Sequence, residues 1–186
     1  MNNNTKIYLL LFLFIFLIIV SCIIYININK FENTHSYDGV CALDLDGTIT
    51  CGIYNAKKAI QICKDANYKI AINTARPSKY YSDIKLDLLG LKESDFIDDF
   101  YYGETLKCSF GDYQCLENNI SATKLKHLIT IENKWKVPRN KIILFDDVYQ
   151  NVKIAEDNGF SVIYANNPAC GINENFENKL YNIINS

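Results

Sequence analysis

Apolar and polar residues alternate along the chain in short blocks, and the pattern of the apolar residues predicts the elements of regular structure. Several of the apolar blocks are short runs of aliphatic and aromatic residues that end abruptly in polar ones. Continuous runs of this kind are typical of strands that are buried on both faces of a parallel sheet. They predict strands at residues 40–43, 69–73, 100–102, 142–145 and 160–164.

Between these runs, apolar residues recur at the spacing of a helix with one buried face. This spacing predicts helices near residues 56–63, 78–89, 125–135, 152–155 and 176–184. Strands and helices that alternate in this way predict an α/β fold. We therefore expect a three-layer, Rossmann-like domain with a mostly parallel sheet, and functional residues at the carboxyl ends of the strands.

An apolar stretch at residues 7–28 precedes this domain and is interrupted only by Ser21, Cys22 and Asn27. A helix of about 22 residues is roughly 33 Å long, which matches the hydrocarbon core of a bilayer. We expect one N-terminal transmembrane helix and a membrane localisation, with the side that the domain faces undetermined. A long, cleaved signal sequence is the alternative and would give a secreted protein, but its apolar part is usually only about 7–15 residues long. Residues 19–22 also resemble a lipoprotein cleavage site, which would place a lipid on Cys22.

These boundaries predict a tail at residues 1–6, an anchor at 7–28, a polar linker at 29–38 and the α/β domain at 39–186. The formal net charge is −2, and no basic run is long enough to suggest a nucleic-acid partner. The membrane and a substrate are therefore the expected partners, and the oligomeric state stays open.

Seven cysteines leave the redox compartment open. Cys41 falls in a predicted strand and Cys63 on a predicted helix face, where each is expected simply to pack in the core. Cys108 and Cys115 flank a loop-like stretch and would form a disulfide if the domain faces an oxidising space. Cys51 follows the first predicted strand closely, but we do not expect a catalytic thiol there.

Two aspartates follow the first predicted strand, in the segment Asp44–Thr48, which reads Asp-Leu-Asp-Gly-Thr. Alternate residues of an extended chain share a side, so Asp44 and Asp46 are expected to point the same way. Gly47 lets the chain turn sharply after them. Two carboxylates this close repel unless a cation or a shared proton offsets their charge. A bare pair of turn carboxylates is the alternative, but the apolar run before the segment and the Gly-Thr within it favour a site.

The segment Asp44–Thr48 resembles the first signature of the haloacid dehalogenase-like phosphatases. The second signature of that family, a Thr or Ser after the next strand, matches Thr74. The third, a Lys near a helix start, matches Lys124, with Lys126 as the alternative. The fourth, an acidic pair after another strand, matches residues 146–147. All four signatures occur in the family's order and span nearly the whole chain beyond the apolar stretch.

The resemblance implies phosphoryl transfer with Asp44 and Asp46 as catalytic residues. Asp44 would attack phosphorus and become an aspartyl-phosphate, and Asp46 would protonate the leaving oxygen and later activate water. Dehalogenases of this superfamily lack the second aspartate, so Asp46 favours phosphoryl chemistry over carbon–halogen cleavage.

The resemblance also implies a set of groups that hold the substrate's phosphate. Thr74 through its hydroxyl and Lys124 through its charge would hold the phosphoryl oxygens. Gly47 and Arg76 would also lie at this phosphate, although Arg76 could instead hold only its own loop.

Mg²⁺ is the cofactor that the resemblance implies. It would be bound by one oxygen of Asp44, the backbone carbonyl of Asp46 and the side chain of Asp147, with waters completing an octahedron. Asp147 is the expected direct ligand and Asp146 a partner outside the coordination shell, although the reverse assignment stays open.

The spacing of the signatures leaves little room for a cap domain. A long loop at about residues 103–121 is too short for a full cap. The resemblance therefore favours a capless or small-insert branch similar to acid phosphatases, hydrolysing phosphomonoesters, with this loop shaping specificity. A phosphotransferase with the same intermediate and a catalytically silent, membrane-tethered binding or scaffold protein are the alternatives. Whether the phosphorylated substrate is a small molecule or a macromolecule stays open.

Overall fold

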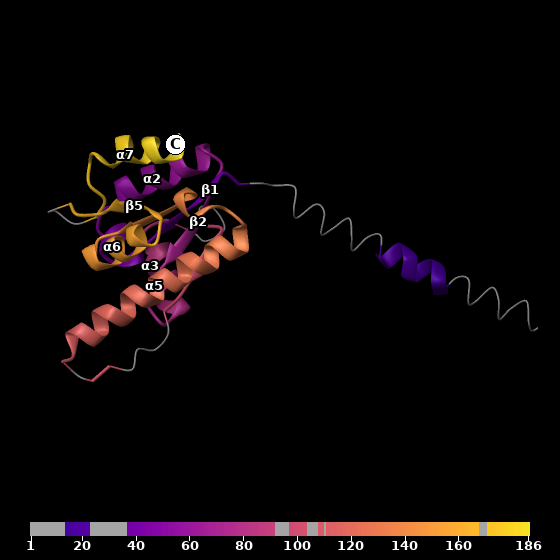
Figure 1. Cartoon of the computed structure of the whole chain (residues 1–186), viewed down its shortest axis with the longest axis horizontal. Coiled ribbons are helices and arrows are strands. Elements are labelled where there is room, and N and C mark those ends of the chain that lie inside the picture. The colour runs from indigo at the N-terminus through magenta and orange to yellow at the C-terminus, as the bar shows by residue number, and fades with distance from the viewer. Residues whose placement is uncertain (1–13, 23–36, 92–96, 104–107, 110, 168–170) are drawn as a thin grey trace, which may run out of the picture. The chain divides into compact units, whose positions relative to one another are not determined.

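The computed structural model describes residues 14–22, 37–91, 97–103, 108–109, 111–167 and 171–186 (Figure 1). The chain divides into two compact units, Met1–Ser36 and Tyr37–Ser186. All the described strands belong to the second unit.

In the first unit, residues 14–22 are helical, and most of their large apolar side chains are exposed. Within the part of the chain that the structure describes, no helix is both long enough and apolar enough to cross a bilayer. Residues 1–13 and 23–36, which hold the predicted tail, both ends of the predicted anchor and most of the predicted linker, lie outside the described residues.

The described strands form one parallel, five-stranded sheet in the order β3-β2-β1-β4-β5. The order places β1 at the centre, so its C-terminal end is flanked by those of β2 and β4. The strands are β1 (Gly39–Leu43), β2 (Tyr68–Asn73), β3 (Asp99–Tyr101), β4 (Ile142–Asp146) and β5 (Ser161–Tyr164). This sheet confirms the predicted Rossmann-like α/β fold.

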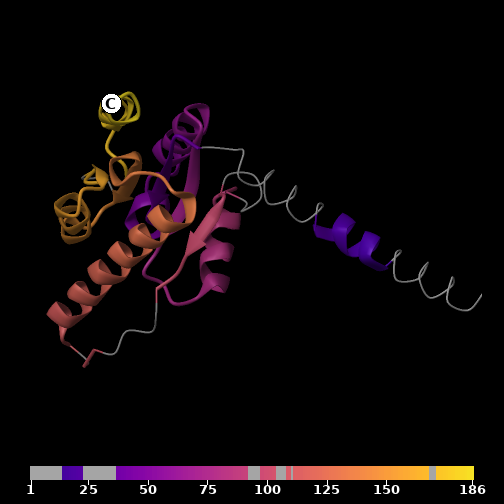
Figure 2. The ribbon, with the colours of Figure 1, turned by 45° about the vertical axis from the view of Figure 1, so that its right-hand side comes forward.

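Helices cover both faces of the sheet and give the domain three layers (Figures 1 and 2). One apolar cluster packs α2 and α7 against one face, and a second packs α5 and α6 against the other. The helices are α2 (Ile53–Asp65), α3 (Lys79–Leu88), α5 (Tyr113–Trp135), α6 (Tyr149–Asp157) and α7 (Phe176–Ile184), and the short turn η2 (Arg139–Lys141) precedes β4.

Alternate residues of the central strand belong to different clusters. Cys41 and Leu43 of β1 face the α2 and α7 side, while Val40 and Ala42 face the α5 and α6 side. Every residue of β1 is buried. Burial on both faces is the physical reason why the strand reads as an unbroken apolar run.

Helix α5 is longer than predicted, and part of the predicted loop at residues 103–121 is helical. The prediction began this helix near Leu125, whereas α5 begins at Tyr113. Asp112 caps it, because its side chain accepts a hydrogen bond of 3.0 Å from the backbone N–H of Cys115. The first turns of α5 are mostly exposed, so they carry no apolar periodicity that would have revealed them.

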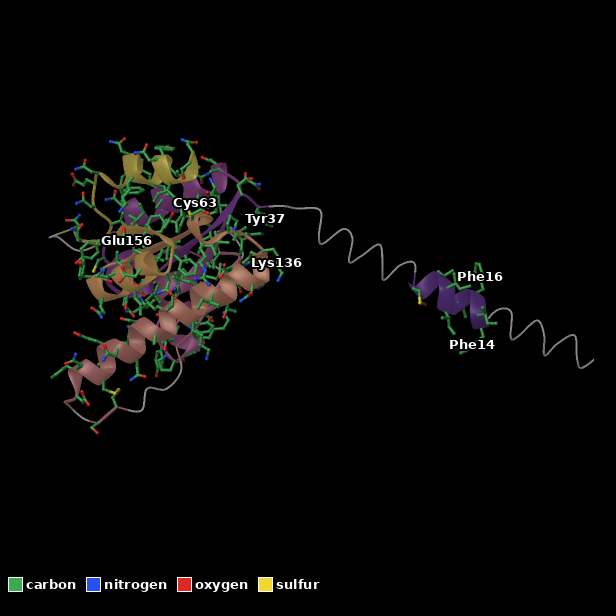
Figure 3. All side chains as sticks on the ribbon, viewed as in Figure 1. Phe14, Phe16, Tyr37, Cys63, Lys136 and Glu156 are labelled. Carbon is green, nitrogen blue, oxygen red and sulfur yellow. A yellow bond between two sulfur atoms is a disulfide. The ribbon has the colours of Figure 1, made fainter. Side chains whose placement is uncertain are left out.

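Disulfides link several of the cysteines. Cys41 of β1 and Cys63 of α2 are bonded to each other, so the expectation that they only pack was wrong (Figure 3). Both residues belong to the same apolar cluster, where the strand and helix meet. Cys108 and Cys115 form the disulfide that the sequence left open, and Cys51 is also disulfide-bonded.

Candidate active site

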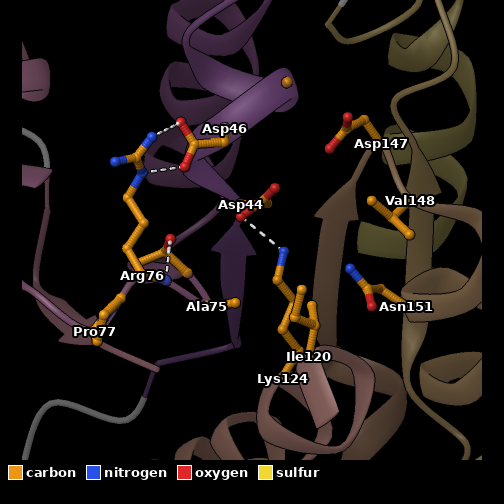
Figure 4. Close-up of a pocket in the computed structure, with 12 residues that line it drawn as sticks. Asp44, Asp46, Ala75, Arg76, Pro77, Ile120, Lys124, Asp147, Val148 and Asn151 are labelled. Carbon is orange, nitrogen blue, oxygen red and sulfur yellow. Dashed lines mark hydrogen bonds and ion pairs between the residues drawn. The ribbon is translucent and has the colours of Figure 1, made fainter. Parts of the chain in front are cut away.

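Polar residues from the ends of three neighbouring strands meet at one edge of the sheet. Asp44 follows β1, Thr74 follows β2, and Asp146 ends β4. Asp44 and Thr74 border a cavity of about 500 Å³ at the carboxyl ends of the strands, where parallel α/β sheets usually place their sites (Figure 4). The cavity is lined by Asp44, Asp46, Gly47, Thr74, Ala75, Arg76, Pro77, Ile120, Lys124, Asp147, Val148 and Asn151.

The turn η1 (Leu45–Ile49) takes the chain away from β1 directly after Asp44. Gly47 has a φ of 78°, a conformation that glycine adopts without strain. A β-carbon on this residue would collide with the carboxylate of Asp147. Gly47 therefore serves as a turn residue that lets the chain pass close to Asp147.

Lys124 reaches the site from α5 and connects two aspartates. Its Nζ lies 2.7 Å from an oxygen of Asp44 and 2.6 Å from an oxygen of Asp146. The side chain is only 3% exposed, whereas Lys126 is exposed. Of the two lysines that matched the third signature, the structure brings Lys124 to the site.

The carboxyl group of Asp44 is buried, and burial is the largest cause that raises its pKa to about 7. The positive charge of Lys124 opposes this rise, and the carboxylates of Asp146 and Asp147 add to it. The pKa of Lys124 is raised in turn, because Asp44 and Asp146 more than offset the effect of its burial. This part of the site is a crowded group of charges with little access to water.

Asp146 and Asp147 occupy different environments although they are adjacent. Asp146 is fully buried, and one of its oxygens accepts hydrogen bonds of 2.9 Å from the backbone N–H of Val148 and from Asn151. Its other oxygen accepts a hydrogen bond of 2.6 Å from the Nζ of Lys124. Asp147 lines the cavity and is half-buried, and burial and the charge of Asp146 raise its pKa.

Carboxylate oxygens of Asp44, Asp146 and Asp147 lie within 4.8 Å of one another. Asp44 and Asp147 line the cavity, while the oxygens of Asp146 are already engaged by protein donors. Within this cluster, Asp44 and Asp147 are therefore the better placed pair to hold a cation, and the role of Asp147 as a metal ligand stays a prediction.

Asp46 is held by two cationic side chains. The guanidinium group of Arg76 contacts it through Nε and through Nη2, the latter at 2.8 Å, and the Nζ of Lys85 lies at 2.6 Å. Burial tends to raise the pKa of Asp46, but hydrogen bonds from Arg76 and Lys85 more than offset this effect and lower it. In this structure Arg76 thus contacts Asp46, and its backbone N–H donates to Thr74 Oγ1 over 3.2 Å.

Several polar residues at the site were not predicted from the sequence. Asn73 donates to the backbone oxygen of Lys124 over 3.3 Å, and its own oxygen lies 2.8 Å from the Nδ1 of His127. These bonds fix α5 against the end of β2, next to Thr74. The position of His127 three residues after Lys124, on the same helix face, was the available signal. Nothing in the sequence marks Lys85, which α3 carries to Asp46.

Comparison with known proteins identifies a shared fold. No protein-family model matches the sequence, and no curated protein matches it significantly. The core domain of a "putative phosphoglycolate phosphatase" from Streptococcus pneumoniae TIGR4 superposes with a TM-score of 0.51 at 13% identity, over 82% of this chain and 98% of that chain. An uncharacterized protein from Corynebacterium glutamicum ATCC 13032 gives a TM-score of 0.49 at 14% identity, over 80% and 93%. At this identity, the likeness to the streptococcal domain shows the Rossmann-like fold alone.

Proposed function

We propose that this chain is a magnesium-dependent phosphomonoester hydrolase of the haloacid dehalogenase-like type, with Asp44 as its nucleophile. The observation that carries the proposal is the convergence of Asp44, Thr74, Lys124 and Asp147 on one cavity from separate segments of the chain. Each of them matches one of the family's four signatures. A pair of turn carboxylates without a role would require neither a buried lysine nor a second acidic pair beside it.

In this mechanism, a carboxylate oxygen of Asp44 attacks the phosphorus of the substrate. A bond forms between the two atoms while the bond from phosphorus to the leaving oxygen breaks, and Asp46 gives the leaving oxygen a proton. Water then attacks the aspartyl-phosphate, and Asp46 takes its proton. Inorganic phosphate leaves, and Asp44 is restored. Asp46 acts in these steps only after its carboxylate has left Arg76 and Lys85, since both hold it as an anion.

Lys124 and Thr74 would hold the phosphoryl group in position. The ammonium of Lys124 lies 2.7 Å from Asp44, so it is close to any group that bonds to that carboxylate. Thr74 lines the same cavity with its side chain almost fully buried. Fixed donors in a site that excludes water are worth most where negative charge develops, which here is on the phosphoryl oxygens.

The donor set fits Mg²⁺. Asp44 and Asp147, with the backbone carbonyl of Asp46, would hold the ion through oxygen atoms only, as magnesium prefers. The pKa values of Asp44 and Asp147 are both raised, chiefly by burial and also by the neighbouring carboxylate of Asp146. A bound cation would favour the charged form of both carboxylates. When bound, the ion would neutralise charge between these carboxylates and the substrate's phosphate.

We also propose the capless or small-insert form of the enzyme. Among the cavity residues, Ile120 belongs to the predicted insert at 103–121. Within the described residues, this insert therefore contributes one side chain of α5 to the lining of the cavity. An open site of this kind admits phosphomonoesters on small or large molecules.

Hydrolysis of 4-nitrophenyl phosphate by the purified chain tests the proposal. We expect Mg²⁺-dependent release of phosphate, and loss of at least about a hundredfold in kcat when Asp44→Asn removes the nucleophile. Transfer of the phosphoryl group to an acceptor alcohol in preference to water would instead identify a phosphotransferase. A folded wild-type chain without phosphoryl chemistry would indicate a binding protein and contradict the proposal.

A further inference from the structure

Positive charge is in excess where Arg76 and Lys85 meet Asp46. Both cations are directed at the single carboxylate of Asp46, and the Nη2 of Arg76 and the Nζ of Lys85 contact the same oxygen at 2.8 and 2.6 Å. The carboxylate therefore neutralises only part of their charge. Lys124 differs, because two carboxylates, those of Asp44 and Asp146, share it.

This excess charge lies at the open end of the site. The side chains of Arg76 and Lys85 are each 36% exposed, and that of Asp46 is 39% exposed. The side chains of Lys124 and Asp44 are only 3% and 6% exposed. Figure 4 shows Arg76 on the opposite side of Asp46 from Lys124. The site thus has a closed end at Lys124 and an open, positively charged end at Arg76.

The proposed reaction directs the leaving group of the substrate toward this open end. The phosphoryl group would lie at Asp44, and the leaving oxygen would lie toward Asp46, which protonates it. The remainder of the leaving group then continues past Asp46, toward Arg76 and Lys85. A group on this part of the substrate would meet two cations that the phosphoryl group itself does not occupy.

We infer that Arg76 and Lys85 form a second anion site, and that the preferred substrates are phosphomonoesters whose leaving group carries a second anion, a carboxylate or a phosphate. This inference rests on the proposed function. A guanidinium group binds either anion through parallel hydrogen bonds, and an ammonium group adds a mobile point charge. The second anion replaces Asp46 as the partner of these cations, which leaves the Asp46 side chain able to turn to the leaving oxygen.

Helix α3 offers a matched control for Lys85. Lys79 lies on the same helix, and its Nζ pairs with Asp83 at 3.0 Å. Its side chain is 47% exposed. Neither lysine is among the described residues that line the cavity, but the Nζ of Lys85 contacts Asp46 at 2.6 Å. Lys85→Gln and Lys79→Gln therefore remove the same charge from the same exposed helix, but only the first changes the proposed anion site.

A series of three-carbon phosphates tests the inference on the full chain with Mg²⁺. The compounds are 3-phosphooxypropanamide, 3-phosphooxypropanoate and propane-1,3-diyl bisphosphate, which end in a neutral amide, a carboxylate and a phosphate. We expect kcat/KM to be about tenfold or more higher for an anionic compound than for the amide, since one charge-assisted contact is worth roughly that factor. Lys85→Gln should reduce this ratio about tenfold, and Lys79→Gln should leave it unchanged. Comparing kcat/KM for the carboxylate and the bisphosphate shows which anion the second anion site prefers.

Other results would contradict the inference in distinguishable ways. Equal kcat/KM for all three compounds would exclude the second anion site while leaving the hydrolase intact. A preference for the anionic compounds that is unchanged in Lys85→Gln would exclude Lys85 from the anion site. An equal loss for all three compounds in Lys85→Gln would mean that Lys85 only holds Asp46. No turnover of any compound by the folded wild-type chain would contradict the proposed function, and the inference with it.

Discussion

At the scale of single residues, Asp44 combines burial with crowding by like charges. Burial raises its pKa to about 7, against the attraction of Lys124. In an unfolded chain an aspartate has a pKa of about 3.9. Between these values the folded chain holds a proton that the unfolded chain has lost, so the free energy of unfolding falls as pH rises through this window.

The variant Asp44→Asn should remove this pH dependence. In the presence of a metal chelator, we expect the melting temperature of the wild type to fall between pH 5 and pH 8 by more than that of the variant. Each 1 kcal/mol of lost free energy of unfolding lowers the melting temperature by roughly 2–4 °C. Thermal unfolding at both pH values measures it. The same pH dependence in both proteins would show that Asp44 is not the titrating group.

Asp146 and Asp147 should differ in what their replacement costs. Asp147→Ala should raise the Mg²⁺ concentration for half-maximal activity by about tenfold or more, with little loss of stability, because Asp147 faces the cavity. Asp146→Ala leaves the buried Lys124 without one partner and should destabilise the fold by about 3 kcal/mol. Magnesium titration and urea unfolding separate the effects, and the reverse pattern would exchange their roles.

Residues that follow a strand could be found from the sequence, and residues that depend on helix orientation could not. Asp44, Thr74 and Asp147 are marked by the apolar runs before them. Lys85 is one of several helix lysines, and only the packing of α3 decides that it reaches Asp46. The bonds of Asn73 and His127 likewise depend on which face of α5 meets β2.

At the scale of elements, the disulfide between Cys41 and Cys63 ties β1, the strand that Asp44 follows, to α2. It closes a loop with a sequence separation of 22 residues, which corresponds to about 3 kcal/mol of stabilisation in the chain-entropy description. We expect the double variant Cys41→Ala/Cys63→Ala to lose about this much free energy of unfolding in urea.

The pair Cys108 and Cys115 is the control for that measurement. Its sequence separation is only 7 residues, and Cys115 lies on an exposed part of α5. The variant Cys108→Ala/Cys115→Ala should therefore lose less stability. If both double variants lost the same free energy of unfolding, the longer loop would add nothing. If a reductant left the free energy of unfolding of the wild type unchanged, Cys41 and Cys63 would only be packing residues.

The central strands β1, β2 and β4 were predictable because nearly all their residues are buried. Strand β4 spans Ile142–Asp146, and the apolar run that predicted it ends one residue earlier. The start of α5 was not predictable in this way. Its first turns bury little and rely on the Asp112 cap, so no periodic pattern marks them.

At the scale of the whole molecule, the proposed chemistry is assigned to the unit Tyr37–Ser186. Among the described residues, those that line the cavity all belong to this unit. We propose that residues 7–28 anchor the chain in a membrane. The exposed apolar side chains of residues 14–19 favour an apolar environment.

A comparison of the full chain with residues 37–186 tests this anchor. We expect the full chain to remain with membranes after an alkaline carbonate wash, and the shorter chain to stay in the supernatant with its activity retained. Recovery of the full chain in the supernatant would contradict the anchor, and a mature N-terminus that begins beyond the apolar stretch would show a cleaved signal sequence.

The proposed mechanism requires that Asp44 becomes phosphorylated during turnover. Acid quenching of the chain with Mg²⁺ and an isotopically labelled aryl phosphate, followed by peptide mapping, measures this directly. We predict a hydroxylamine-sensitive phosphoryl group on the peptide that contains Asp44, absent in Asp44→Asn. Full turnover without protein-bound phosphate, retained in Asp44→Asn, would exclude Asp44 as the nucleophile.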